Sequence, residues 1–141
     1  MGATTLCAAL LTLGFSASGP QVEKYAAWPQ GPSADPDYFP IGVWLQQPRN
    51  ASRYRELGIN FYLGLWQGPT ETQLAELGAA DMPVICAQND VGLANLDNPT
   101  IIGWMHSDEP DNAQSRKGGG YGPPVDPARV HEDYDKWRAA D

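Results

Sequence analysis

Two adjacent carboxylates followed by a proline are the residues of this chain that are best suited to chemistry. Asp108 and Glu109 precede Pro110 and follow the apolar run 101–105 after two intervening residues, His106 and Ser107. A proline disfavours the helical conformation of the residue before it, so we expect Glu109 to be extended and its side chain to be held at a defined angle. A neighbouring carboxylate and a partial wall of Trp or Tyr would keep such an acid protonated, as a general acid at neutral pH requires.

Metal and thiol chemistry are less well supported by the sequence. The two histidines, His106 and His131, are far apart and no Cys/His set has metal-ligand spacing. The acids from 108 to 111 lack the alternate spacing of a calcium loop. Cys86 follows Val84 and Ile85 in an apolar run, so we expect a buried, inert thiol. The sequence therefore predicts neither a metal nor a cofactor.

The composition describes one acidic, folded domain. The chain has 141 residues, a formal net charge of -8 and a hydrophobic fraction of 42%. This length suffices for one domain with a core. The negative charge argues against nucleic acid as a partner, since few cations are present to neutralise phosphates. It equally argues against a basic membrane-binding patch.

The amino-terminal residues divide into two segments before the domain. Residues 1–18 carry no charge and hold the apolar run 6–15 followed by Ser-Ala-Ser, which is typical of a secretory signal peptide, although a buried core helix is the alternative. Residues 19–37 are rich in Pro, Gly, Ser and Ala and are interpreted as a linker or arm. We expect the folded domain to occupy 38–141 and the protein to be secreted or periplasmic, with no membrane attachment after cleavage.

Short apolar runs alternate with short helical patterns through the domain. We predict strands within 41–45, 59–66, 83–87 and 100–105, with helices within 50–57, from 70 onward and from 126 onward. The runs are continuous rather than alternating, which favours parallel strands buried on both faces. The segment 88–99 has little helical pattern. The fold class is therefore α/β. We expect the chain to be the amino-terminal half of a larger (β/α)8 barrel and to contain about four βα units.

In a parallel α/β barrel the active-site residues lie at the carboxyl ends of the strands. Indole faces stack on sugar rings while amides and acids bond hydroxyls, so this edge suits a carbohydrate. Each Trp is equally well explained as a core residue, and Gln88 and Asn89 are equally well explained as turn residues. Asp111 and Asn112 are better explained as turn and cap residues than as ligands. Besides Asp108, the candidate substrate-binding residues are Trp44, Trp66, Gln88, Asn89 and His106.

Four segments together resemble a family: FPIGVW, YRELGINFYLGLW, DMPVICAQN and NPTIIGWMHSDEPDNAQ. They resemble the first four βα units of the retaining barrel glycoside hydrolases, most closely secreted members whose fourth strand ends in Asp-Glu-Pro. The resemblance implies that Glu109 is the acid/base and that Asp108, where the family usually has asparagine, contacts the sugar 2-hydroxyl. It also implies a nucleophilic glutamate on a seventh strand, which has no counterpart in this chain.

The resemblance predicts a secreted enzyme that hydrolyses O-glycosidic bonds of an oligo- or polysaccharide. Because this chain holds only one carboxylate of the pair, we expect it to be inactive alone. Two other interpretations stay open. One is a non-catalytic carbohydrate-binding protein on a degenerate barrel, and the other is a free-standing α/β domain with a structural role.

Overall fold

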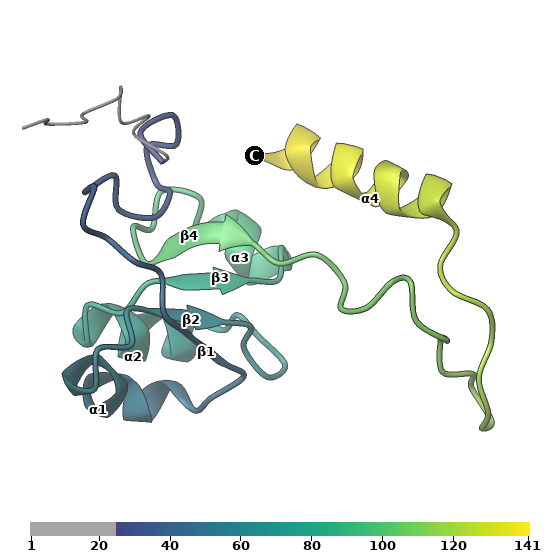
Figure 1. Cartoon of the computed structure of the whole chain (residues 1–141), viewed down its shortest axis with the longest axis horizontal. Coiled ribbons are helices and arrows are strands. Elements are labelled where there is room, and N and C mark those ends of the chain that lie inside the picture. The colour runs from purple at the N-terminus through teal and green to yellow at the C-terminus, as the bar shows by residue number, and fades with distance from the viewer. Residues whose placement is uncertain (1–24) are drawn as a thin grey trace, which may run out of the picture.

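The computed structural model describes residues 25–141, which form an α/β domain around one parallel sheet (Figure 1). The predicted signal segment 1–18 lies outside the described residues. The strands are β1 (Gly42–Trp44), β2 (Phe61–Leu63), β3 (Val84–Cys86) and β4 (Ile101–Trp104). They pair in the order β1-β2-β3-β4, and every pair is parallel. The prediction of four parallel strands is therefore confirmed, although each strand is shorter than its apolar run.

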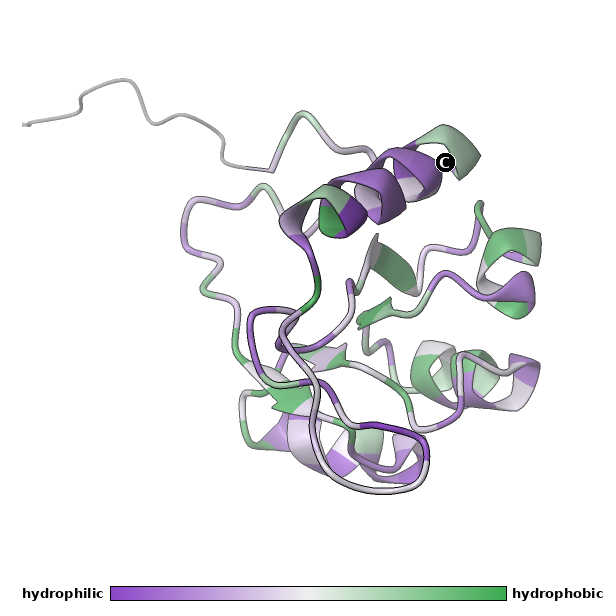
Figure 2. Ribbon diagram, turned by 90° about the vertical axis from the view of Figure 1, so that its right-hand side faces the viewer, coloured by the Kyte–Doolittle hydropathy of each residue, from purple (hydrophilic) through white to green (hydrophobic). Residues whose placement is uncertain are grey.

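Short helices connect the strands. The 3-10 helix Pro48–Asn50 runs into α1 (Ala51–Glu56), α2 is Glu71–Ala79, and α4 is Pro127–Ala140. The segment between β3 and β4 contains α3 (Asp90–Ala94), which the sequence did not predict. Viewed along the strands, the helices form an arc on one side of the sheet, ending with α4 at the carboxyl terminus (Figure 2). This arrangement is the one that repeated right-handed βα connections produce.

Two of the helix starts were predicted from their capping residues, and both are confirmed. Thr70 accepts a hydrogen bond from the backbone N–H of Gln73 at 3.2 Å, and the Gln73 side chain accepts one from the Thr70 N–H at 3.0 Å. These reciprocal bonds satisfy two amides at the start of α2 that have no partner within the helix. Asp126 caps α4 through the Ala128 N–H, with Pro127 in the first turn.

The core lies between the sheet and α1–α3. Tyr62, Val84 and Cys86 are fully buried and belong to one cluster with Leu77 of α2. The alternate strand positions face away from this cluster and are also apolar: Trp44, Phe61, Leu63 and Ile85. The sheet therefore has an apolar side chain on both faces, but only one face is covered by helices within residues 25–141.

The segment predicted as a linker touches the domain where the structure describes it. The side-chain amide of Gln30 donates to the carbonyl of Leu96 at 2.8 Å, and the ring of Tyr25 lies edge-on to Tyr38 with centroids 6.4 Å apart. Residues 25–37 contain turns but no helix or strand. None of the helices described over 25–141 is long and apolar enough to cross a bilayer.

Candidate functional site

Because all four strands are parallel, their carboxyl ends lie together at one end of the sheet, which is called the carboxyl edge below. Trp44 is the last residue of β1 and is 42% exposed, and Trp66 follows β2 and is 66% exposed. Neither indole is part of the core formed by residues 25–141. Large exposed aromatic surfaces at this edge are available to stack on a ligand. Trp104, by contrast, packs against the core.

The two candidate amides after β3 both have structural partners. Asn89 caps α3 by accepting from the Gly92 N–H at 2.9 Å, and its amide donates to the carbonyl of Pro69 at 2.9 Å. Gln88 donates to the backbone carbonyl of Trp137 in α4 at 3.1 Å. The turn interpretation therefore describes Asn89, whose two polar groups are occupied, while Gln88 connects β3 to α4.

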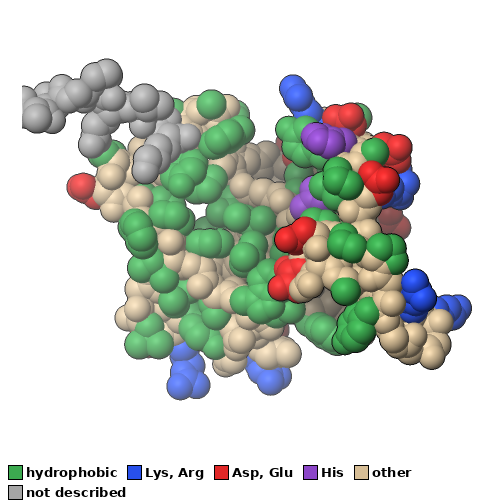
Figure 3. Space-filling view, turned by 45° about the vertical axis from the view of Figure 1, so that its right-hand side comes forward, with side chains coloured by type: hydrophobic (Ala, Val, Ile, Leu, Met, Phe, Trp, Pro, Cys, Tyr) green, Lys and Arg blue, Asp and Glu red, His purple; other side chains and the backbone are tan. Residues whose placement is uncertain are grey.

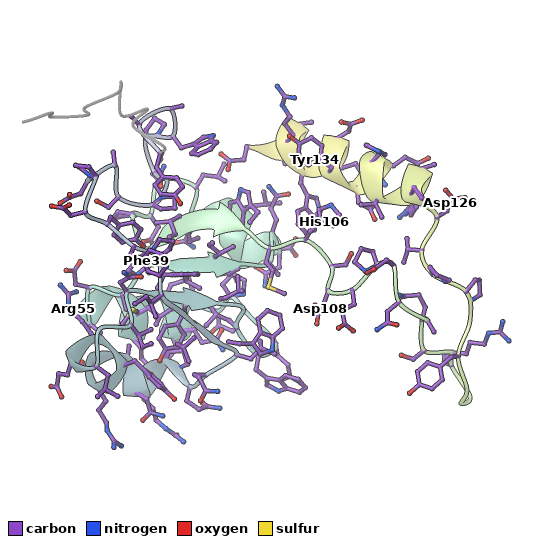
Figure 4. The ribbon with its side chains drawn as sticks, viewed as in Figure 1. Phe39, Arg55, His106, Asp108, Asp126 and Tyr134 are labelled. Atoms are coloured by element: carbon purple, nitrogen blue, oxygen red, sulfur yellow. The ribbon has the colours of Figure 1, made fainter. Side chains whose placement is uncertain are left out.

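His106 lies under α4 rather than open to solvent (Figure 4). Its ring is 4.6 Å from the ring of Trp137, centroid to centroid, at a tilt of 35°. Its Nδ1 is 3.5 Å from the Ser107 hydroxyl, and its Nε2 is buried without a hydrogen-bond partner among the described residues. The contacts of His106 are thus with α4, and Figure 4 shows Asp108 on the other side of the segment, pointing away from this helix.

The conformation of Glu109 differs from the prediction. Its φ is +44°, in the left-handed region, so the expected extended conformation is wrong. Proline disfavours the right-handed helical region for the residue that precedes it, but that residue can still adopt a left-handed turn conformation. That turn is closed by a hydrogen bond from the Asn112 N–H to the Glu109 carbonyl at 3.0 Å and by another from the Val125 N–H to the Pro110 carbonyl at 2.8 Å.

Two neighbours that the sequence did not assign as site residues hold Glu109. The amide of Asn112 donates to Glu109 Oε2 at 3.0 Å, and the amide of Gln114 donates to its carbonyl at 3.1 Å. Asn112 was predicted to be a turn or cap residue, which its bond in the turn after Glu109 confirms, whereas nothing in the pattern singles out Gln114. Glu109 and Asp108 are both exposed, so the partial aromatic wall expected around the acid is wrong.

Among residues 25–141, three of the four non-glycine residues with a positive φ lie at the carboxyl ends of the strands, and the fourth, Asp81, precedes β3 at the opposite end. Leu45, Gln67 and Glu109 have φ values of +48°, +53° and +44°, and each follows a different strand at its carboxyl end. A left-handed conformation costs a residue with a side chain about 1–2 kcal/mol. Such residues cluster at functional sites, because the surrounding structure must maintain them. This observation supports the carboxyl edge as the site and does not depend on residue types.

Cys86 is not a candidate nucleophile. It is fully buried, and burial raises the pKa of its thiol from 9.0 to about 12, so it is neutral at physiological pH. This confirms the predicted inert thiol. Over residues 25–141, no group of three or more His, Cys, Asp or Glu side chains is arranged to hold a metal ion.

A groove lies along β4 and not around Glu109. Its volume is about 650 Å³, and it is lined mainly by apolar residues of the amino-terminal arm and the sheet, including Trp28, Ile85, Ile102 and Trp104. Asp141 lines its far side and accepts a hydrogen bond from the Trp104 indole. No sequence pattern predicts this groove, because it forms between segments more than fifty residues apart.

Comparison with protein-family models, curated proteins and solved structures finds no match to this chain.

Proposed function

We propose that this chain forms one half of a (β/α)8 barrel of the retaining glycoside hydrolase type, with Glu109 as its general acid/base. The observation that carries the proposal is the position of Glu109: it lies in a turn with a positive φ in the segment that follows the carboxyl end of β4, in a sheet whose four parallel strands follow chain order. Barrel enzymes use residues at the carboxyl ends of their strands. The four segments that resemble these hydrolases, FPIGVW to NPTIIGWMHSDEPDNAQ, assign the same role to the same residue.

The proposed reaction has two steps. Glu109 donates its proton to the glycosidic oxygen as a second carboxylate attacks the anomeric carbon, which breaks the bond to the leaving group and forms a glycosyl ester. Glu109 then removes a proton from water, which attacks the same carbon and releases the carboxylate. The two carboxyls must be about 5–5.5 Å apart. Four strands supply Glu109 but not the second group, which belongs to the other half of the barrel.

The substrate is proposed to be an oligo- or polysaccharide. The exposed indoles of Trp44 and Trp66 offer apolar faces to sugar rings, and exposed Asp108 is available to accept a hydrogen bond from a sugar hydroxyl. His106 and Asn89 are proposed to contribute indirectly, since their contacts shape the segment after β4 and the start of α3.

Glu109→Gln in the protein carrying both barrel halves tests this function. Hydrolysis of a panel of aryl glycosides and polysaccharides should fall by at least about 10²-fold, because general acid–base catalysis typically contributes 10²–10⁴-fold. Glu76→Gln is the matched control, since it makes the same change on the exposed surface of α2 and should leave the rate unchanged. Equal rates for Glu109→Gln and the control would remove Glu109 from the mechanism.

A non-catalytic carbohydrate-binding protein is the second candidate, and one observation favours it. Glu109 is exposed and lacks the aromatic wall that an acid catalyst needs, whereas the exposed indoles of Trp44 and Trp66 already offer the stacking surfaces that binding needs. Calorimetric titration with the same polysaccharides distinguishes the two. Binding that is lost in Trp66→Ala but unchanged in Glu109→Gln, with no hydrolysis in either, would establish the binder in place of the enzyme.

We also propose that the protein is exported. The support is the uncharged apolar segment 1–18 with its Ser-Ala-Ser end. Fusion of this segment to a reporter enzyme, followed by assay of the culture medium and periplasm, tests export. Retention of the reporter in the cytosol would contradict it.

A further inference from the structure

The segment between the Glu109 turn and α4 contains a hairpin, residues 114–122. Its two arms are joined by an antiparallel bridge between Ser115 and Tyr121. Two backbone hydrogen bonds, of 2.7 and 3.0 Å, pair the arms on either side of that bridge. The hairpin projects away from the sheet in Figure 1, and no third strand joins it. A two-stranded hairpin of this kind is marginally stable in water, so it opens at little cost in free energy.

The tip of the hairpin stands in open space. Gly118, Gly119 and Gly120 have φ values of +106°, +100° and +76°, and a Cβ added at any of them would meet no atom within 4 Å. Glycine gains more conformational freedom on unfolding than any other residue, which further favours opening of the tip. Exposed tips of small residues are the preferred sites of proteolytic cleavage.

Two cations, Arg116 and Lys117, directly precede these glycines. Both are exposed, and neither forms an ion pair with any acid of residues 25–141. Figure 3 shows a group of Lys and Arg side chains at the outer end of the carboxyl-terminal part, with no acid beside it on this face. In a chain with a formal net charge of -8, the hairpin is therefore a local positive site.

The other cations that the structure describes are placed differently. All six lie within helices: Arg49, Arg53, Arg55, Arg129, Lys136 and Arg138. Arg55, Arg129 and Lys136 also form ion pairs with aspartates or glutamates. Proteolysis acts on the opened backbone, and a helix must unwind before it is opened. Within 25–141, only the hairpin combines a Lys or Arg side chain with backbone outside a helix.

We propose that Arg116 and Lys117 form a proteolytic processing site for an endoprotease with an acidic specificity pocket. An acidic pocket selects Lys or Arg at the residue before the cut. Water adds across the amide bond between Lys117 and Gly118, which leaves a carboxylate on Lys117 and an amino group on Gly118. The positive hairpin attracts such a pocket, whereas the acidic remainder of the surface repels it. The site depends only on the hairpin and not on the proposed hydrolysis of glycosides.

The cut also affects the turn that contains Glu109. Gln114, in the first arm, donates to the Glu109 carbonyl at 3.1 Å, and its own carbonyl accepts from the Gly122 N–H in the second arm. The Val125 N–H donates to the Pro110 carbonyl at 2.8 Å. After cleavage, the bonds of Gly122 and Val125 join two chain segments that the hairpin no longer links, so closing them costs more entropy. Cleavage therefore loosens the Glu109 turn.

Limited digestion of the whole chain with trypsin tests the site. Intact mass should show that the first cut within 25–141 follows Arg116 or Lys117. The double variant Arg116→Gln, Lys117→Gln should lose this cut, and its cleavage within 25–141 should be at least about tenfold slower, because the remaining described sites require a helix to unwind. Arg53→Gln is the matched control, since it removes an exposed cation of α1 and should leave the first cut at the hairpin. A first cut within a helix, or equal digestion of the double variant and the control, would overturn the inference.

Amide exchange measures the effect of the cut on the turn. The Val125 N–H should exchange at least about tenfold faster in the cut protein, because the bond that protects it opens more often. The Tyr62 N–H, which donates to the Pro83 carbonyl within the sheet, should exchange at the same rate before and after the cut. Unchanged exchange at Val125 after complete cleavage would refute the loosening of the turn.

Discussion

Gln73 makes two side-chain hydrogen bonds, one at the start of α2 and one to the backbone of the exposed Trp66, and its substitution tests both. Its side-chain oxygen accepts from the Thr70 N–H at 3.0 Å, and its side-chain amide donates to the carbonyl of Trp66 at 3.1 Å. Gln73→Ala removes both bonds. A capping bond and an ordinary hydrogen bond each contribute about 1 kcal/mol net, so the free energy of unfolding should fall by about 2 kcal/mol.

Gln73→Glu separates the two contributions. The glutamate keeps an oxygen for the Thr70 N–H but has no N–H to donate to Trp66. Its negative charge in the first turn of α2 is favourable and offsets part of that loss. We therefore expect a decrease of less than about 1 kcal/mol, smaller than for the alanine variant.

Urea unfolding followed by circular dichroism and tryptophan fluorescence measures these differences. Thr72→Ala is the matched control, because Thr72 is exposed in the same helix and its substitution should change stability by less than about 0.5 kcal/mol. The expected order of loss is Gln73→Ala, then Gln73→Glu, then the control. Equal losses in the two Gln73 variants would refute the contribution of the capping bond.

Three further predictions concern the core, the pH dependence and α4. Leu77 is fully buried, so Leu77→Ala should cost about 2–5 kcal/mol in urea unfolding, whereas Leu57→Ala on the exposed surface should cost less than about 0.5 kcal/mol; similar losses in both would contradict the assigned core. Burial raises the pKa of Cys86 from 9.0 to about 12 and that of Tyr62 from 10.0 to about 12. Above pH 9 the unfolded chain loses these protons before the folded one does, so the free energy of unfolding should decrease between about pH 9 and 12, and a flat profile would refute the burial argument. Asp126→Ala removes the cap of α4 and should weaken that helix by about 1 kcal/mol, seen as faster amide exchange in 127–140. Because α4 has no buried residue, global unfolding should change little, and a large global loss would contradict that description.

The sequence was sufficient where local chemistry determines the structure. The box formed by Thr70 and Gln73 and the Asp126–Pro127 pair set two helix starts, since each needs only residues within one turn. The strands were found because apolar runs on a parallel sheet are continuous. α3 was missed because it has five residues with Gly92 inside it. That glycine allows a close approach of a residue distant in sequence, since a Cβ there would lie 3.0 Å from the Trp104 ring.

The candidate site was predicted less well, for a related reason. Strand ends can be located from the sequence, so the exposure of Trp44 and Trp66 at one edge follows from their positions. The conformation of Glu109 does not follow from Pro110 alone. It depends on a turn closed by Asn112 and tied to Val125, a contact made across the segment before α4. Rules that use only neighbouring residues do not predict such a contact, and so the extended conformation was expected in error.

The strict sequential order of the strands has a consequence for synthesis on the ribosome. Each strand pairs with the one translated just before it, so the paired residues are only 17 to 22 positions apart along the chain. β1, β2 and β3 can assemble with α1 and α2 before β4 has left the exit tunnel. The amino-terminal arm is different, because Gln30 must wait for Leu96 before it can bond. The first described residues of the chain are thus among the last to reach their final positions.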